Sequence, residues 1–328
     1  MDVALYTGNS GTQTISGLDF SPDLLWIKSR SAAYSHRLFD TVRGVTKALY
    51  PDLTEAEGAA QGTNENLTAF TSDGFSLGSA SGIDAINNNN VTFAGWAWDG
   101  GTTTATNTDG SITSNVRANA STGFSIVTWT GQSSGSATIG HGLNAAPELI
   151  ILKGRTGSVG WTVGHESIGW TKRLQLNTTA ALSTSSNYWN DTAPTNSVFT
   201  SGANNVSNTF VAYCFAPVAG YSAFGSYSGN GSTDGPFVFT GFRPRWILIK
   251  RIGAAASWVL HDTERSTYNV SGAELLPNDS GAEYTYTRLD FLSNGFKART
   301  TEAASNTSGN TYVYAAFAEH PFKTARAR

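Results

Sequence analysis

Charged residues are scarce in this sequence. Asp, Glu, Lys and Arg make up 14% of the 328 residues, whereas about 25% is usual for soluble domains. The net charge is −3 and the basic residues are scattered along the chain. The sequence therefore lacks the concentrated positive surface with which proteins bind nucleic acids, and no nucleic-acid partner is expected.

Cysteine and long hydrophobic runs are nearly absent too. Cys214 is the single cysteine, which excludes an internal disulfide, and its apolar surroundings predict a buried free thiol. No apolar stretch approaches the length of a membrane span, and residues 1–8 resemble a strand more than a basic and then apolar leader. We expect no membrane insertion and no signal peptide.

Glycine and aromatic residues are plentiful instead. The chain has 35 Gly and 9 Trp, and aromatic residues make up 12% of it. Ser, Thr and Asn fill most polar positions, while the residues that long helices need on their surfaces are few. Small polar and β-branched residues favour strands joined by tight turns. The composition predicts an all-β fold.

A proline followed six residues later by a lysine occurs three times, with an apolar run between them. The runs are Pro22–Lys28, Pro147–Lys153 and Pro244–Lys250. Consecutive apolar residues that do not alternate with polar ones predict a strand buried on both faces. Proline is tolerated at the first position of such a strand, where no ladder donor is needed. The chain is thus a threefold internal repeat.

Other landmarks recur in the same order around each run. Each copy opens with an aromatic–x–Gly turn, has a glycine before the proline, and closes with a strand that begins with Thr and an aromatic residue. Two further positions correspond between the copies. The residues eight positions after each lysine are His36, Trp161 and Trp258. Those twelve positions after it are Asp40, His165 and Asp262.

These landmarks divide the chain into three antiparallel β-sandwich modules. We predict a first module over residues 1–99, a second over 123–219, and a third over 220–328 that ends in a short basic tail. The Gly/Thr/Ser/Asn-rich residues 100–122 are interpreted as a linker. A propeller-like arrangement is the alternative, but the lysines are 125 and 97 residues apart, and this unequal spacing argues against a closed ring.

Several long phrases resemble a repeat domain of tailed-bacteriophage virion proteins, of the kind found in marine phages and often described as tail fibre. They are residues 220–250, residues 311–328 and, in the second copy, the segments FSIVTW, IGHGLNAAPELIILK and FVAYCFAPVAGYS. The resemblance covers residues 120–328 well and the first copy more loosely. It implies a component of the phage virion with lectin-like β-sandwich modules, which assembles as a homotrimer.

No catalytic residues emerge from the sequence. Asp40 and Asp262 are the candidates for a glycosidase pair, but they occupy equivalent slots in different modules, and their Asp-Thr-x-Arg context suits a turn with a local ion pair. The histidines lack the spacing of metal ligands, and the Asn/Asp-rich turns match no calcium-loop pattern. We therefore expect no enzyme activity, no cofactor and no metal site.

Glycan binding is the remaining candidate activity. Lectin sites stack a sugar ring on an aromatic side chain and surround it with polar groups. The second copy has aromatic residues that its siblings lack, and unshared aromatics in a loop are better candidates for binding than those the common core requires. The predicted glycan-binding residues are Trp170, Tyr188, Trp189, Asn190 and Asp191. Core packing is the alternative role for the tryptophans.

From the sequence we therefore expect a phage tail fibre or tail-associated adhesin that binds a host-surface polysaccharide or receptor. Its other partners would be virion tail proteins. Such a protein would be made in the host cytoplasm and located in the virion. A non-adhesive structural part of the capsid, collar or baseplate is the first alternative, and a glycan depolymerase is the second.

Overall fold

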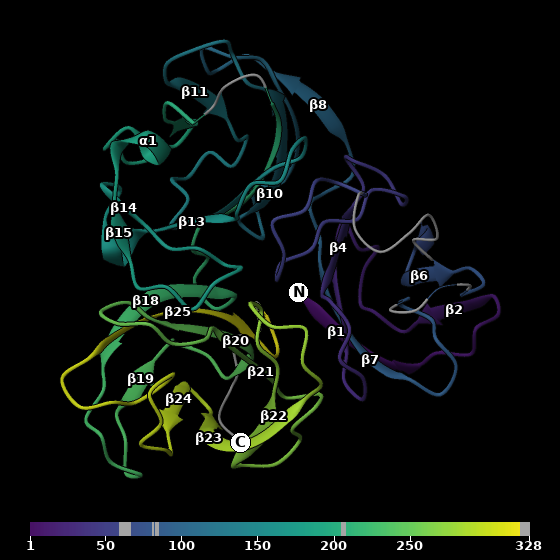
Figure 1. Ribbon diagram of the computed structural model, residues 1–328, viewed down its shortest axis with the longest axis vertical. Helices are drawn as coiled ribbons and strands as arrows, with labels where there is room; N and C mark the ends of the chain where they lie inside the picture. The colour runs from purple at the N-terminus through teal and green to yellow at the C-terminus, as the bar shows by residue number, and fades with distance from the viewer. Residues whose placement is uncertain (59–66, 81, 83–84, 205–207, 322–328) are drawn as a thin grey trace.

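The protein is almost entirely β-sheet (Figure 1), which confirms the predicted fold class. The computed structural model describes residues 1–58, 67–80, 82, 85–204 and 208–321. The predicted basic tail lies outside the described residues. Within these ranges, no helix has the length and apolar character needed to cross a membrane.

Module 1, residues 1–99, is a sandwich of two antiparallel sheets. The inner sheet has the order β1-β7-β3-β4 and the outer sheet the order β2-β6-β5. The strands are β1 (Asp2–Thr7), β2 (Gln13–Ser16), β3 (Leu24–Ser29), β4 (Arg37–Asp40), β5 (Leu67–Thr71), β6 (Gly74–Leu77) and β7 (Thr92–Trp98).

Module 2, residues 100–219, has an inner sheet of order β13-β12-β17-β10-β9-β8 and two small sheets, β11-β16 and β14-β15. Its strands are β8 (Thr104–Asn107), β9 (Ser114–Asn119), β10 (Phe124–Thr130), β11 (Ala137–Gly140), β12 (Leu149–Gly154), β13 (Thr162–His165), β14 (Lys172–Arg173), β15 (Ser183–Thr184), β16 (Val198–Ser201) and β17 (Thr209–Phe215). Its helical segments are the 3-10 turn η1 (Glu166–Ile168) and α1 (Ser186–Trp189).

Module 3, residues 220–328, has an inner sheet of order β18-β25-β20-β21 and an outer sheet of order β19-β24-β23-β22. The strands are β18 (Ser222–Ser228), β19 (Phe237–Phe239), β20 (Pro244–Arg251), β21 (Val259–Asp262), β22 (Ser271–Glu274), β23 (Tyr284–Leu292), β24 (Gly295–Ala298) and β25 (Thr311–Ala318).

The linker interpretation of residues 100–122 is wrong. Strand β9 pairs with β10 along its whole length, and β8 pairs with β9, so this segment extends the inner sheet of module 2 by two strands. Val116 on β9 is buried in the module's own core. A Thr- and Asn-rich sequence suits an edge hairpin with one solvated face, and composition alone did not separate that from a linker.

The proline-led strands β3, β12 and β20 lie inside their sheets and are buried on both faces, as predicted. In β3, Leu25 and Ile27 face the core between the two sheets of module 1, whereas Leu24 and Trp26 face a second core that all three modules share. Alternate residues of a strand point to opposite faces. The continuous apolar run is therefore explained by two cores, one on each side of the inner sheet.

The repeated aromatic residues build the same contact in each module. The opening aromatic stacks on the aromatic of the closing strand, with ring centroids 5.0 Å apart for Tyr6 and Phe93, 5.3 Å for Trp129 and Phe210, and 5.1 Å for Tyr227 and Tyr312. The glycines before the prolines, Gly17, Gly142 and Gly241, all have positive φ values. Such backbone angles favour glycine and explain why it recurs there.

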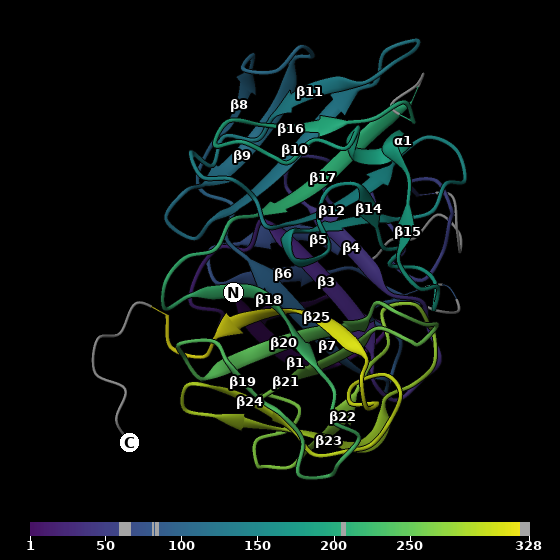
Figure 2. The same cartoon turned by 90° about the vertical axis from the view of Figure 1, so that its left-hand side faces the viewer.

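The three modules surround a common centre (Figures 1 and 2). The shared core contains residues of all three inner sheets. The ring centroid of Trp98 from module 1 lies 6.2 Å from that of Phe215 in module 2 and 5.5 Å from that of Trp246 in module 3. The unequal lysine spacing argues against a closed ring, and that expectation is wrong. Strands β8 and β9 account for much of the extra chain between Lys28 and Lys153. They lie at the edge of a sheet, so the three modules still close into a ring.

The repeated lysines join each module to the one before it in the ring. The Nζ atom of Lys153 in module 2 donates to the carbonyl of Thr54 in module 1 at 2.9 Å, and that of Lys250 in module 3 donates to Thr179 in module 2 at 2.9 Å. Lys28 in module 1 closes the cycle by donating to Ser280 in module 3 at 3.0 Å. Burial lowers the pKa of Lys153 and Lys250 to about 8.

In every interface, the side chain eight residues after the lysine contacts a backbone carbonyl of the neighbouring module. The indole of Trp161 donates to the Tyr50 carbonyl at 2.7 Å, and that of Trp258 donates to the Gln175 carbonyl at 2.8 Å. His36 lies 3.0 Å from the Leu276 carbonyl through Nε2, and its Nδ1 accepts from the Trp26 indole. That arrangement requires the neutral tautomer with a proton on Nε2, which donates as an indole does.

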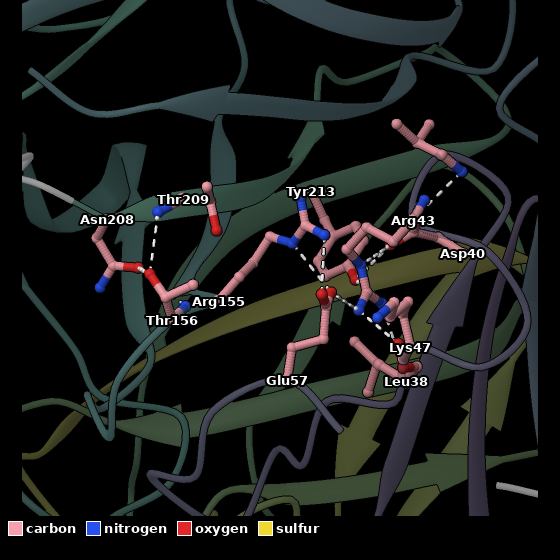
Figure 3. A network of polar contacts seen from close by, with 11 residues as sticks. Leu38, Asp40, Arg43, Lys47, Glu57, Arg155, Thr156, Asn208, Thr209 and Tyr213 are labelled. Atoms are coloured by element: carbon pink, nitrogen blue, oxygen red, sulfur yellow. Dashed lines mark hydrogen bonds and ion pairs between the residues drawn. The ribbon is translucent and has the colours of Figure 1, made fainter. Parts of the chain in front are cut away.

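The interface between modules 1 and 2 contains a buried ion-pair network (Figure 3). Arg43 is paired with Asp40 at 2.5 Å and with Glu57 at 2.9 Å, and Glu57 also pairs with Arg155 of module 2 at 2.8 Å. Tyr213 of module 2 donates its hydroxyl to Asp40 at 2.9 Å. The local ion pair predicted for the Asp-Thr-x-Arg turn is therefore present, and it is extended across an interface.

The interface between modules 3 and 1 repeats this network. Arg265 pairs with Asp262 at 2.6 Å and with Glu283 at 3.0 Å, Glu283 pairs with Arg30 of module 1 at 2.9 Å, and the Trp96 indole donates to Asp262 at 2.8 Å. Burial opposes ionisation of Asp262, but the Arg265 guanidinium outweighs it and holds the pKa of Asp262 below its usual range.

The interface between modules 2 and 3 replaces every charge of this network. The equivalent positions are occupied by His165 for Asp, Ile168 for Arg, Leu182 for Glu, Ile252 for the second Arg and Ala315 for the aromatic donor. Ile168 belongs to the shared core, and Leu182 and Ile252 pack against it. Ala315 offers no side-chain donor. A carboxylate at position 165 would therefore lack the hydrogen bond that an aromatic side chain donates in the other two interfaces. His165 lies instead 3.1 Å from the Tyr314 carbonyl through Nε2.

Replacing Asp40 by alanine should destabilise the protein by about 3 kcal/mol or more, since it leaves the Arg43 guanidinium buried without its closest carboxylate. Urea unfolding measures this. Asp19, an exposed aspartate of the same module, is the matched control, and Asp19→Ala should stay within about 0.5 kcal/mol of wild type. Equal effects of the two substitutions would contradict the role of the network.

The His165→Gln variant tests the apolar interface through pH. Burial lowers the pKa of His165 to about 4, so between about pH 6.5 and 4 the unfolded chain binds a proton at this residue that the folded protein does not. Wild-type stability is therefore lost through this group as pH falls across that window. Glutamine does not bind this proton, so the variant does not lose stability in this way. Its free energy of unfolding relative to wild type should therefore rise by on the order of 3 kcal/mol from pH 7 to pH 4. A constant difference in urea-unfolding free energies would refute this account.

Candidate functional site

Module 2 contains a cavity of about 420 Å³ that opens beside the end of β12. Ligand sites in proteins typically have volumes of roughly 300–1,000 Å³. Part of its wall comes from β14 and α1, two short elements inserted between β13 and β16. Its polar lining includes Arg173, Gln175, Asn187, Tyr188, Asn204 and Asn208.

Arg173 and Tyr188 form the most specific feature of this lining. The guanidinium carbon of Arg173 lies 3.7 Å from the centroid of the Tyr188 ring, which is a close cation–π contact. Burial lowers the pKa of Arg173 from its usual value. Within the described residues Arg173 has no salt bridge, and none of the described residues that line the cavity is acidic.

Tyr188 is held in place by the residues around it on α1. Ser185 caps the start of the helix by accepting from the Asn187 amide, and Asn190 ends it in the left-handed conformation with φ 51°. The following Trp189 side chain is buried and packs edge-on against Trp170, with ring centroids 5.3 Å apart. A short helix with little stability of its own is thus fixed by one large buried side chain.

The side-chain amides on the cavity wall differ in how they are bonded. Asn208 accepts from the Thr156 amide at 2.9 Å and is thereby tied to the end of β12, next to the ion-pair network of Arg155 (Figure 3). The side chains of Gln175, Asn187 and Asn204 make no hydrogen bond to any other described residue and belong to half-buried or exposed positions. They retain donors and acceptors for a ligand.

The structure separates the five residues predicted to bind glycan. Trp170 and Trp189 are only 5% and 1% exposed, so neither ring offers a face for a sugar, and their predicted binding role is wrong. The Trp170 indole donates to Glu166 at 2.7 Å. Both rings lie in the module's own core together with Ile139 of β11 and Phe199 of β16. Tyr188 does line the cavity, whereas Asn190 and Asp191 are exposed in the turn after α1 and do not line it.

Sequence reasoning missed Arg173. A bridge between two strand segments identifies equivalent leucines in the three modules, Leu49, Leu174 and Leu275. The residue before each leucine is Ala48, Arg173 and Glu274 respectively. An arginine at a position where the sibling modules have alanine and glutamate was the available signal, but it becomes visible only once the strand register is known.

The residues considered for glycoside hydrolysis, thiol chemistry and metal binding do not form a site among the described residues. Asp40, His165 and Asp262 are buried in module interfaces, and Cys214 is buried in β17 as predicted. No group of three or more His, Cys, Asp or Glu side chains among the described residues is arranged to hold a metal ion.

Comparison with protein families identifies one match, a family described as Domain of unknown function (DUF7483), over residues 1–321. The chain belongs to this family. Searches among curated proteins and among solved structures found no match. The match spans all three modules.

Replacing Gly164 on β13 by alanine should disturb the Trp170–Trp189 pair. A Cβ atom at this position would lie 2.8 Å from Cζ2 of Trp189 and still closer to the Trp170 ring, and such overpacking costs about 1–3 kcal/mol. Near-UV circular dichroism and urea unfolding should both change. Gly253→Ala, where the nearest side-chain atom lies 3.8 Å from the added Cβ, is the control and should leave both signals unchanged.

Proposed function

We propose that this protein is an adhesin of a phage virion, part of the tail or its fibres, and that it binds a host-surface polysaccharide through the module 2 cavity. The resemblance of residues 120–328 to tailed-phage virion domains supports the virion context. Assembly as a homotrimer, with other tail proteins as neighbours, remains part of this proposal.

The observation that carries the proposal is the composition of the cavity wall. It combines one half-buried tyrosine, one arginine and several amides that bond to no other described residue, in a space of about 420 Å³. Sugars present hydroxyl groups that both donate and accept, and amide side chains do the same. A rigid aromatic side chain adds contact area at a small entropic cost.

The cavity suits binding better than hydrolysis. Most glycoside hydrolases use two carboxylates that flank the scissile bond. None of the described residues that line this cavity is an aspartate or glutamate. The depolymerase alternative therefore has no residues at this site to support it, and the proposed protein holds its glycan without cleaving it.

A non-adhesive structural role is the second candidate, and exposed aromatic side chains in module 3 favour it. Phe239 and Phe237 on the edge strand β19 are 65% and 47% exposed, and Tyr268 is 85% exposed. Exposed apolar side chains of this size are typical of surfaces that contact other proteins. Immuno-electron microscopy of the virion discriminates the two roles, because an adhesin is expected at the distal tail and a structural part at the capsid or neck.

The Tyr188→Ala variant tests the adhesin proposal. It should lose roughly tenfold or more of the affinity for the glycan that the wild-type protein selects from an array of bacterial surface polysaccharides, because an aromatic side chain central to a site contributes strongly. Tyr268→Ala removes an exposed tyrosine of module 3 and should bind as wild type does. The proposal fails if Tyr188→Ala, shown to be folded by its unfolding curve, binds every glycan as tightly as wild type.

A further inference from the structure

Arg173 is a cation with no carboxylate partner among the described residues. Arg43, Arg265 and Arg288, which are buried more deeply, are each paired with a carboxylate. Arg173 makes no ion pair and no hydrogen bond with any described residue, and its Nε atom is shielded from solvent without a partner. Burying part of a charge without pairing it costs free energy, which a ligand of opposite charge would offset.

The surroundings of Arg173 hold the guanidinium at the cavity without neutralising it. Strand β14 fixes its backbone by pairing Arg173 with Ser183 on β15, and the Tyr188 ring supports the guanidinium at 3.7 Å. The other polar groups that the described residues contribute to the cavity wall are amides, hydroxyls and backbone groups, all formally neutral. The described part of the wall thus has one positive charge among neutral hydrogen-bonding groups.

We infer that the ligand of this cavity is an acidic saccharide whose carboxylate or sulfate group pairs with Arg173 while its hydroxyl groups bond to the neighbouring amides. The inference rests on the proposed glycan-binding function and adds the charge class of the sugar. A planar guanidinium presents parallel N–H donors that match the two oxygens of a carboxylate. An anionic group in this position would supply the partner that Arg173 lacks.

The experiment measures binding of the full chain to three probes by affinity electrophoresis in native gels. Polygalacturonate carries carboxylates, dextran sulfate carries sulfates, and dextran is neutral. The wild-type protein should bind a polyanion and not dextran. Arg173→Gln should weaken that binding roughly 10- to 100-fold, as expected for loss of a charge-assisted hydrogen bond. Preference for polygalacturonate over dextran sulfate would identify a carboxylate, and the reverse a sulfate.

Two variants control the result. Arg299→Gln removes a half-exposed arginine of module 3 with the same change in net charge, and it should bind polyanions as wild type does. Arg173→Lys keeps the charge without the bidentate geometry and should fall between wild type and Arg173→Gln. Equal losses in Arg299→Gln and Arg173→Gln would reveal non-specific attraction and overturn the inference.

The failure of this inference differs from that of the proposed function. If Tyr188→Ala abolishes binding to a neutral polysaccharide while Arg173→Gln binds it as wild type does, the cavity binds glycan and the acidic class is wrong. The inference is equally overturned if the wild-type protein binds neither polyanion. If Tyr188→Ala and Arg173→Gln both leave every interaction unchanged, the cavity is not the glycan site at all.

Discussion

The shared core at the centre of the ring is the constraint on which the rest of the structure depends. Each inner sheet is covered on one face by its own module and on the other by the two neighbouring modules. Trp98 illustrates this, because its ring contacts Phe215, Trp246 and Phe317, which belong to modules 2 and 3. A module separated from its neighbours would expose an entire apolar sheet face to water, at a cost of roughly 25 cal/mol per Å². The three modules are therefore one folding unit, although each has a core of its own.

The three interfaces are built from two different kinds of contact. Two of them bury an Asp–Arg–Glu–Arg network that an aromatic donor from the next module completes, and the third uses Ile168, Leu182 and Ile252. A buried ion network and a well-packed apolar set of similar volume often have similar net stability, whereas a partial network is costly. This explains why all the charged residues of the network are replaced together in the interface between modules 2 and 3. A carboxylate at position 165 would lack both its arginine and its aromatic donor, and the neutral His165 satisfies a backbone carbonyl instead.

The sequence was sufficient for the features that local physics dictates. The proline-led strands follow from a short-range apolar pattern, and the structure has all three of them. The recurring glycines and aromatic residues were visible in the sequence, but their positive φ values and their ring stacking were found only in the structure. The closed ring was not predictable in this way, because the second apolar face of β3 does not reveal which other module covers it. Nor did the Thr-rich composition of residues 100–122 distinguish an edge hairpin from a linker. Trp170 and Trp189 were misjudged for a related reason: an aromatic residue that its siblings lack can replace a missing part of the core as readily as it can contact a ligand.

The three modules differ in the residue at one position that the common scaffold leaves free. The residue before the bridging leucine is small in module 1 as Ala48, while in module 3 it is Glu274, which is buried and bonded to Arg288. In module 2 the same backbone position carries Arg173, which pairs with Ser183 on β15 and lies against Tyr188 of α1. Trp189 then fixes α1 on the core, so that Tyr188 is directed at Arg173 and not into solvent. One buried tryptophan therefore fixes the position of Tyr188 on the cavity wall, and the surrounding core supplies the rigidity that a four-residue helix lacks.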